Sequence, residues 1–142
     1  MVRVLATGTF DILHPGHLLY LSKARALGDE LYVIVARDSM IKHKPKPIVP
    51  EKQRLTMVQA LRMVDAAMLG SETDMFLPLR EIKPDIIALG KNQFFNEKEL
   101  EEKLAAQGIK AKVVRIQSFE QGELCSSAAI IRKILERNGK SN

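Results

Sequence analysis

The feature that most constrains the fold is a regular alternation of short apolar runs with segments of helical spacing. Runs of strand length lie at about 2–7, 31–36, 65–69, 85–89 and 111–116. Helical spacing marks the intervals at about 15–27, 51–63, 74–82, 96–107 and 126–137. This alternation predicts a parallel sheet with helices on both faces. We therefore expect a single α/β domain over residues 1–142, a Rossmann-like three-layer sandwich with a five-stranded parallel sheet.

One stretch, ATGTFDILHPGH at residues 6–17, joins the first predicted strand to the first predicted helix. Gly8 permits a sharp turn, and Pro15 suits the first position of a helix. His14 and His17 are three residues apart, so their rings can lie on the same side of the helix start. Free backbone N–H groups and the positive end of the helix favour an anion there, most simply a phosphate.

Zinc binding and a plain surface position are the alternatives for the histidines, but no third ligand stands at a characteristic zinc spacing. We therefore predict that His14 and His17 donate hydrogen bonds to a phosphate as it is transferred. The other motif residues are candidates for nucleotide binding, namely Thr7, Gly8, Thr9, Phe10 and Gly16. Asp11 is a candidate metal ligand, with a role in bracing the backbone as the alternative.

Positive charge is concentrated in one segment. The chain carries 22 basic and 17 acidic residues, a net charge of +5. Residues 37–54 alone contribute six of the basic residues against Asp38 and Glu51. Such a segment suits nucleic acid, an acidic membrane or a polyphosphate, or is a solvated loop. Aromatic residues are not interleaved with its lysines, which argues against nucleic acid as a partner.

The sequence also bounds where the protein works. Its first residues read as a strand and not as a secretory leader, and no apolar run approaches the length of a membrane span. A single cysteine, Cys125, fits a reducing compartment and excludes an internal disulfide. We expect a cytoplasmic protein without a membrane partner.

The run GTFDILHPGH resembles the signature of the HxGH nucleotidyltransferase superfamily, which includes cytidylyltransferases and several adenylyltransferases. The resemblance extends over nearly the whole chain, from Val2 to about Leu135. Further matching details are KPxxPExxR at residues 46–54, KPDII at 83–87, and the Cys-Ser-Ser before the last predicted helix. Together these details are most similar to archaeal-type FAD synthases.

This resemblance implies the reaction ATP + FMN → FAD + pyrophosphate, with Mg²⁺ or another divalent cation bridging the phosphates. It implies phosphate contacts from Lys42 or Lys44 and from two serines of the last helix, Ser126 and Ser127. It also implies that the nucleoside is held by Gly90, Asn92 and Gln93. By their residue types alone, the serines could simply cap the helix, and residues 90–93 could form a surface turn.

Two other functions remain open at this point. One is a glycerol-3-phosphate or other sugar-phosphate cytidylyl- or adenylyltransferase, which would use the same chemistry. The stretch Arg62-Met63-Val64-Asp65 resembles a signature of the cytidylyltransferase branch. The other is a nucleotide-binding or nucleic-acid-binding module without turnover. The sequence leaves a homodimer open.

Overall fold

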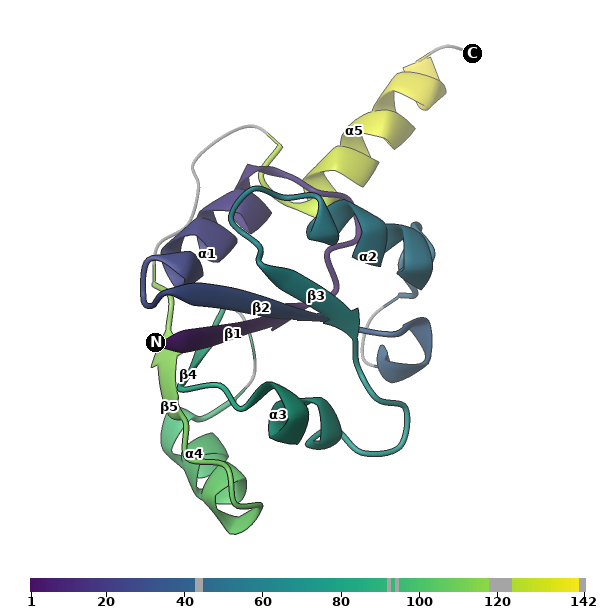
Figure 1. Cartoon of the computed structure of the whole chain (residues 1–142). Helices are drawn as coiled ribbons and strands as arrows, with labels where there is room; N and C mark the ends of the chain where they lie inside the picture. Colours follow the sequence, from purple (N-terminus) through teal and green to yellow (C-terminus); the bar gives the residue numbers. More distant parts are fainter. Residues whose placement is uncertain (43–44, 92, 94, 118–123, 141–142) are drawn as a thin grey trace.

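The computed structural model describes residues 1–42, 45–91, 93, 95–117 and 124–140 (Figure 1). Its strands form one parallel sheet in the order β3-β2-β1-β4-β5. The strands are β1 (Arg3–Gly8), β2 (Glu30–Val35), β3 (Ala66–Leu69), β4 (Ile86–Leu89) and β5 (Lys112–Arg115). The predicted five-stranded parallel sheet is therefore confirmed.

Helices cover both faces of this sheet, which confirms the three-layer arrangement. In Figure 1, α1 (Pro15–Arg25) and α2 (Glu51–Gln59) lie on one face. On the other face lie α3 (Leu77–Ile82) and α4 (Glu97–Ala106). A short 3₁₀ helix, η1 (Asp38–Met40), follows β2, and α5 (Ser127–Lys140) extends away from the sheet. Within the described part of the chain, no helix is long and apolar enough to cross a membrane.

The alternation of side chains along β1 explains the two-sided core. Val4 and Ala6 are fully buried in the cluster that includes Leu21 of α1 and Val58 of α2. Leu5, between them in sequence, is fully buried in the opposite cluster with residues of α3 and α4. Successive strand residues point to opposite faces, so an apolar run buries both faces of a central parallel strand.

Two helices are shorter than predicted by three or more residues at one end. The second helix, predicted to 63, ends at Gln59, because Asp65 already pairs with β2. The Asp65 carboxylate accepts the Leu31 N–H at 2.8 Å, and the Asp65 N–H donates to the Leu31 carbonyl at 2.9 Å. The third helix, predicted from 74, begins at Leu77 because Asp74 accepts the Phe76 N–H in a turn before it.

The sheet opens at the point where its strand order reverses. Pairing of β1 with β2 continues to Gly8 and Val35, but pairing of β1 with β4 stops at Ala6 and Ala88. Beyond that pair, the Tyr20 hydroxyl donates to the Ala88 carbonyl at 2.6 Å and accepts the Thr7 N–H at 3.3 Å. Burial raises the pKa of Tyr20 well above its usual value of 10.0, so the phenol keeps its proton. The phenol therefore bridges the ends of β1 and β4, at the point where ligands of such sheets bind.

Candidate active site

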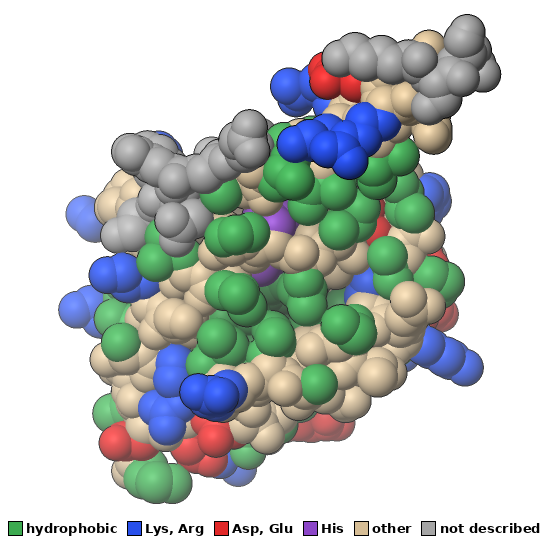
Figure 2. All heavy atoms as spheres, turned by 90° about the horizontal axis from the view of Figure 1, so that it is seen from above, with side chains coloured by type: hydrophobic (Ala, Val, Ile, Leu, Met, Phe, Trp, Pro, Cys, Tyr) green, Lys and Arg blue, Asp and Glu red, His purple; other side chains and the backbone are tan. Residues whose placement is uncertain are grey.

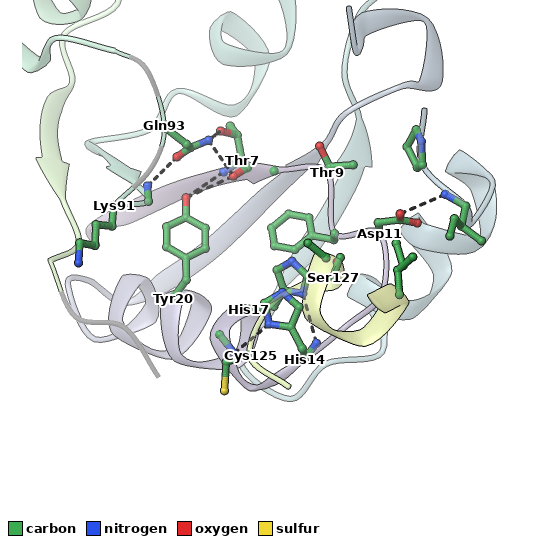
Figure 3. A pocket seen from close by; sticks show the side chains of 18 of the residues that line it. Thr7, Thr9, Asp11, His14, His17, Tyr20, Lys91, Gln93, Cys125 and Ser127 are labelled. Atoms are coloured by element: carbon green, nitrogen blue, oxygen red, sulfur yellow. Dashed lines mark hydrogen bonds between the residues drawn. The ribbon is translucent and has the colours of Figure 1, made fainter. Parts of the chain in front are cut away.

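A cavity of about 1030 Å³ lies at the carboxyl ends of β1 and β4. It is lined by the motif loop after β1, by residues 45–48, by the loop after β4 and by the first turns of α5. Figure 2 looks onto this face of the molecule, where histidine side chains lie in a hollow bordered by hydrophobic side chains. Figure 3 shows the motif residues converging on the cavity from the end of β1 and the start of α1.

The two histidines form a stacked pair at the start of α1. His14 is the residue that caps the helix, and its Nδ1 accepts the Gly16 N–H at 3.1 Å. The Nδ1 of His17 in turn accepts the His14 N–H at 3.3 Å. Their ring centroids are 3.7 Å apart, with an angle of 26° between the planes. The sequence prediction that both rings lie on one side of the helix start is confirmed.

These contacts fix which nitrogen of each neutral ring carries the proton. An Nδ1 that accepts a backbone N–H must be unprotonated, so the proton of the neutral imidazole is on Nε2. Burial lowers the pKa of His14 below its usual value of 6.5, which keeps its ring neutral near pH 7. Both residues therefore carry an Nε2–H donor beside the positive end of α1.

Gly16 is required by the position of the His14 ring. A Cβ atom at residue 16 would lie 2.8 Å from Cε1 and 2.9 Å from Nδ1 of His14, closer than such atoms approach. Gly8 has the same relation to Phe10, whose Cε2 would lie 2.8 Å from an added Cβ. Phe10 has a φ of 53° and is 3% exposed, with its ring centroid 5.3 Å from that of His17. Phe10, a predicted nucleotide-binding residue, is thus a buried side chain that packs beside His17.

Asp11 braces the backbone, the alternative considered from the sequence. Its two carboxylate oxygens accept the N–H groups of Ile48 and Val49 at 3.0 and 2.9 Å. Among the described residues, no group of three or more His, Cys, Asp or Glu side chains is placed to hold a metal ion. A metal-binding role for Asp11 stays a prediction.

Arg54 was not predicted as a site residue, yet it joins the loops around the cavity. Its side chain is fully buried. Nε donates to the Val49 carbonyl at 2.9 Å, and Nη1 donates to the carbonyls of Thr9 and Ala36 at 2.7 and 2.8 Å. Nη2 pairs with Asp38 Oδ1 at 2.6 Å. The only advance signal was its place in the KPxxPExxR run, because a helical position alone does not reveal these partners.

The basic segment places one described lysine at the cavity. Lys46 contributes to the lining, and its Nζ donates to the Asp38 carbonyl at 2.6 Å. Lys42 is exposed and is not among the described residues that line the cavity. Lys44, the other predicted catalytic lysine, is outside the described residues. The sequence reasoning therefore missed Lys46, which lies in the same run of alternating lysines and prolines.

Gln93 lines the cavity but uses its amide within the protein. Its Oε1 accepts the Gly90 N–H at 2.6 Å, and its Nε2 lies 3.1 Å from Thr7 Oγ1 and 3.3 Å from the Thr7 carbonyl (Figure 3). Predicted nucleotide-binding residues from β1 and from the loop after β4 are thus joined directly. Thr9 also lines the cavity, whereas Asn92 is outside the described residues.

The two serines before and in α5 have different positions. Ser127 lines the cavity, with its Oγ 3.4 Å from the Ile12 carbonyl. Ser126 is exposed, and its Oγ accepts the Ala129 N–H at 3.0 Å, the contact of a helix cap. The geometry thus brings Ser127 to the predicted phosphate region and gives Ser126 the capping role.

Comparison with known proteins agrees with this arrangement. The model of the cytidylyltransferase-like family matches residues 5–133. The chain belongs to this family. Within it, the chain is 68% identical over 137 residues to a protein named FAD synthase from Methanohalophilus mahii, covering 96% of each chain. It is 63% identical over 141 residues to the FAD synthase of Methanococcoides burtonii, covering 99% of each.

Solved structures of similar fold are known. A crystal structure described as the lipopolysaccharide core biosynthesis protein from Thermoplasma volcanium has a TM-score of 0.81 and 50% sequence identity. The match covers 84% of this chain and 99% of that protein. A protein of unknown function from Archaeoglobus fulgidus shares the fold, with a TM-score of 0.67 at 18% identity. The predicted resemblance to archaeal-type FAD synthases within the cytidylyltransferase-like family is confirmed by the relatives named above.

Proposed function

We propose that this member of the cytidylyltransferase-like family transfers AMP from ATP to FMN. A phosphate oxygen of FMN attacks the α-phosphorus of ATP, and the bond from that phosphorus to the bridging oxygen of the β-phosphate breaks. The products are FAD, which contains the new pyrophosphate linkage, and inorganic pyrophosphate. The names and near-complete coverage of the relatives support ATP and FMN as the substrates.

The observation that carries the chemical step is the histidine pair at the start of α1. Charge grows on the oxygens of the α-phosphoryl group as the attacking oxygen approaches. Two Nε2–H donors of His14 and His17, with the positive end of the helix, are suited to stabilise that charge. Both rings are held by backbone contacts before substrate arrives, so little reorganisation is needed in the transition state.

The residues that line the cavity suggest how the two substrates lie. One end is bordered by Gly90, Lys91 and Gln93, and we assign the adenosine of ATP to it. The other end is bordered by Pro47 and Ile48 and by Ile131 of α5. These apolar side chains suit the flavin ring system, which has a large apolar surface. The histidines then lie between the two ends, where the phosphates meet.

The leaving pyrophosphate needs positive charge and hydrogen-bond donors. We assign this role to Lys46 and Ser127, which line the cavity, while roles for Lys42, Lys44 and Ser126 stay predictions from the sequence. A divalent cation would be held mainly by triphosphate oxygens and water, because the Asp11 oxygens already accept backbone N–H groups. When bound, the cation would neutralise charge on the phosphates.

The test is a pyrophosphate-release assay with two nucleotides, ATP and CTP, against FMN and glycerol-3-phosphate, with mass spectrometry of the products. We expect turnover with ATP and FMN and a product of the mass of FAD. Turnover confined to CTP and glycerol-3-phosphate would overturn the acceptor and the base while leaving the family intact. Nucleotide binding with no turnover for any pair would favour a binding module.

A further inference from the structure

The loop between β4 and α4 borders the nucleotide end of the cavity, although it has little regular structure. Its described residues contribute Gly90, Lys91 and Gln93 to the lining. Among its described residues, the Gln93 N–H donates to the Gly90 carbonyl at 3.2 Å, and the Phe95 N–H donates to the Gln93 carbonyl at 3.0 Å. The same loop is also held by a side chain from another strand.

Arg115, the last residue of β5, supplies that support. Its Nη1 donates to the carbonyls of Gly90 and Gln93 at 3.0 and 2.9 Å, with the Lys91 carbonyl farther away at 3.4 Å. Its Nη2 donates to the Phe95 carbonyl. One planar group thus gathers carbonyl oxygens from one end of the loop to the other.

The guanidinium is itself fixed by the first residue of α4. Both Nε and Nη2 donate to Glu97 Oε1, at 2.8 and 2.6 Å. The Arg115 side chain is only 17% exposed. Counting these contacts, each N–H of the guanidinium has an acceptor among Gly90, Gln93, Phe95 and Glu97. A lysine ammonium at this position could not reproduce the same planar set of donors.

The loop passes this constraint on to the nucleotide site through Gln93. The same residue whose carbonyl is held by Arg115 reaches across to the Thr7 hydroxyl and to the Gly90 N–H with its amide. Displacement of the Gln93 backbone would therefore move the contact to Thr7 at the end of β1. Arg115 acts on the cavity through residues that line it.

We propose that Arg115 is a positioning residue that sets nucleotide affinity and base selectivity by holding the loop after β4 in its binding conformation. The inference rests on the proposed function, because it assigns the nucleoside to this end of the cavity. A loop with fixed hydrogen-bonding groups rejects the wrong base, since polar groups would be left unpaired. A loop that can change shape loses that discrimination as well as affinity.

The test compares Arg115→Lys with the wild type and with Arg3→Lys. Arg3 is a matched control because it also contacts a carboxylate, Glu30, and a carbonyl, that of Ile82, but at the opposite end of β1. Calorimetric titration with ATP and with CTP, without acceptor, gives affinity and base preference. Pyrophosphate release gives kcat and the KM values for ATP and FMN separately.

For Arg115→Lys we expect the Kd and KM for ATP to rise about tenfold or more, and the preference for ATP over CTP to shrink. The KM for FMN should stay within about twofold, because the residues that we assign to the flavin are not among the contacts of Arg115 described above. Arg3→Lys should alter none of these ratios. A lower melting temperature with unchanged Kd and base preference would overturn the proposal, and so would equal rises in both KM values.

Two safeguards keep the test decisive. If Arg115→Lys fails to fold by circular dichroism, Glu97→Gln replaces it, because it removes the partner charge and keeps the side-chain shape. The same shift in the ATP-to-CTP ratio, with smaller size, is then expected, and an unchanged ratio would overturn the proposal. If the wild type binds ATP but shows no turnover with FMN, the acceptor assignment fails while the titrations still decide the role of Arg115.

Discussion

Two arginines hold the loops on the two sides of β1 in place, and they differ in their burial and in the segments that they contact. Arg54, on the β2 side, is fully buried and contacts Thr9, Ala36, Asp38 and Val49, which belong to three separate stretches of chain. Arg115, on the β4 side, gathers carbonyls of one loop and keeps a small exposed surface.

The two arginines therefore differ in which property of the protein a substitution should change. Because Arg54 joins the motif loop to the chain after β2 and to Val49 near the end of the basic segment, its loss should disturb the fold around the whole cavity. Because Arg115 shapes one loop, its loss should be felt mainly by the ligand group that this loop contacts. Substitutions can therefore separate a contribution to stability from a contribution to specificity.

The largest effect should come from the histidines, which lie between the two sides and belong to neither. Replacing His14 or His17 by alanine removes a donor to the transition state, so we expect kcat to fall by about 10²–10³, about 3–4 kcal/mol. The KM values should change less. Steady-state kinetics with ATP and FMN provide the measurement, and near wild-type rates in both variants would remove the pair from the mechanism.

The next largest effect should be a loss of stability in the variant Arg54→Ala. This substitution takes the Arg54 donors from the half-buried Thr9, Ala36 and Val49 carbonyls, and we expect a loss of about 3 kcal/mol in the free energy of unfolding. Urea unfolding would measure it, with Arg37→Ala as the control, since Arg37 is only half-buried and pairs with Glu51. Equal losses in the two variants would show that Arg54 has no special place.

Lysines on the β2 side should affect turnover and not base preference. We expect Lys46→Ala to lower kcat about tenfold, about 1.4 kcal/mol, with the ratio of ATP to CTP use unchanged. Its melting temperature should stay close to the wild type, because exposed charges contribute little to folding. Lys42→Ala is the comparison from the same loop. Undiminished activity in both variants would identify the segment as a solvated loop.

The smallest expected effect is a pH dependence that arises at His14. Its pKa is lowered by burial below 6.5, so folding favours the neutral ring. The stability that this provides is fully present above pH 6.5 and is lost as the pH falls through the lower pKa of the folded state. Melting temperatures of the wild type should therefore decline more steeply below pH 6.5 than those of His14→Ala. Parallel curves would contradict this.

The fold could be predicted well from the sequence because the apolar pattern reports which face of each element is buried. Along β1, the consecutive apolar residues Val4, Leu5 and Ala6 indicate a strand covered on both sides, and Val4 and Leu5 are indeed in opposite clusters. The histidine turn was also readable, since Pro15 and the three-residue spacing act locally. Helix ends were less accurate, because Asp65 and Asp74 form contacts that depend on neighbouring segments.

The supports of the site could not be read in the same way. Arg54 contacts Val49 nearby, but its other partners are 16 to 45 residues away in the sequence. The partners of Arg115 are 18 to 25 residues away. Which carbonyls a long side chain reaches depends on how the loops pack in the folded protein. The hydrophobic periodicity of the sequence does not predict that packing. For the same reason the sequence does not reveal that the Gln93 amide contacts Thr7 and Gly90, and its predicted role at the nucleotide stays a prediction.

The contact between Gly16 and the His14 ring also limits how this site can change over evolutionary time. The backbone at residue 16 is not in the left-handed region, so other residues could adopt its conformation, and only volume excludes them. A larger residue there would require both the imidazole and the Cys125 carbonyl, 3.1 Å from an added Cβ, to move, and movement of the imidazole would displace the proposed donor to the phosphate. The ring of His14 therefore limits which residues evolution could place at position 16.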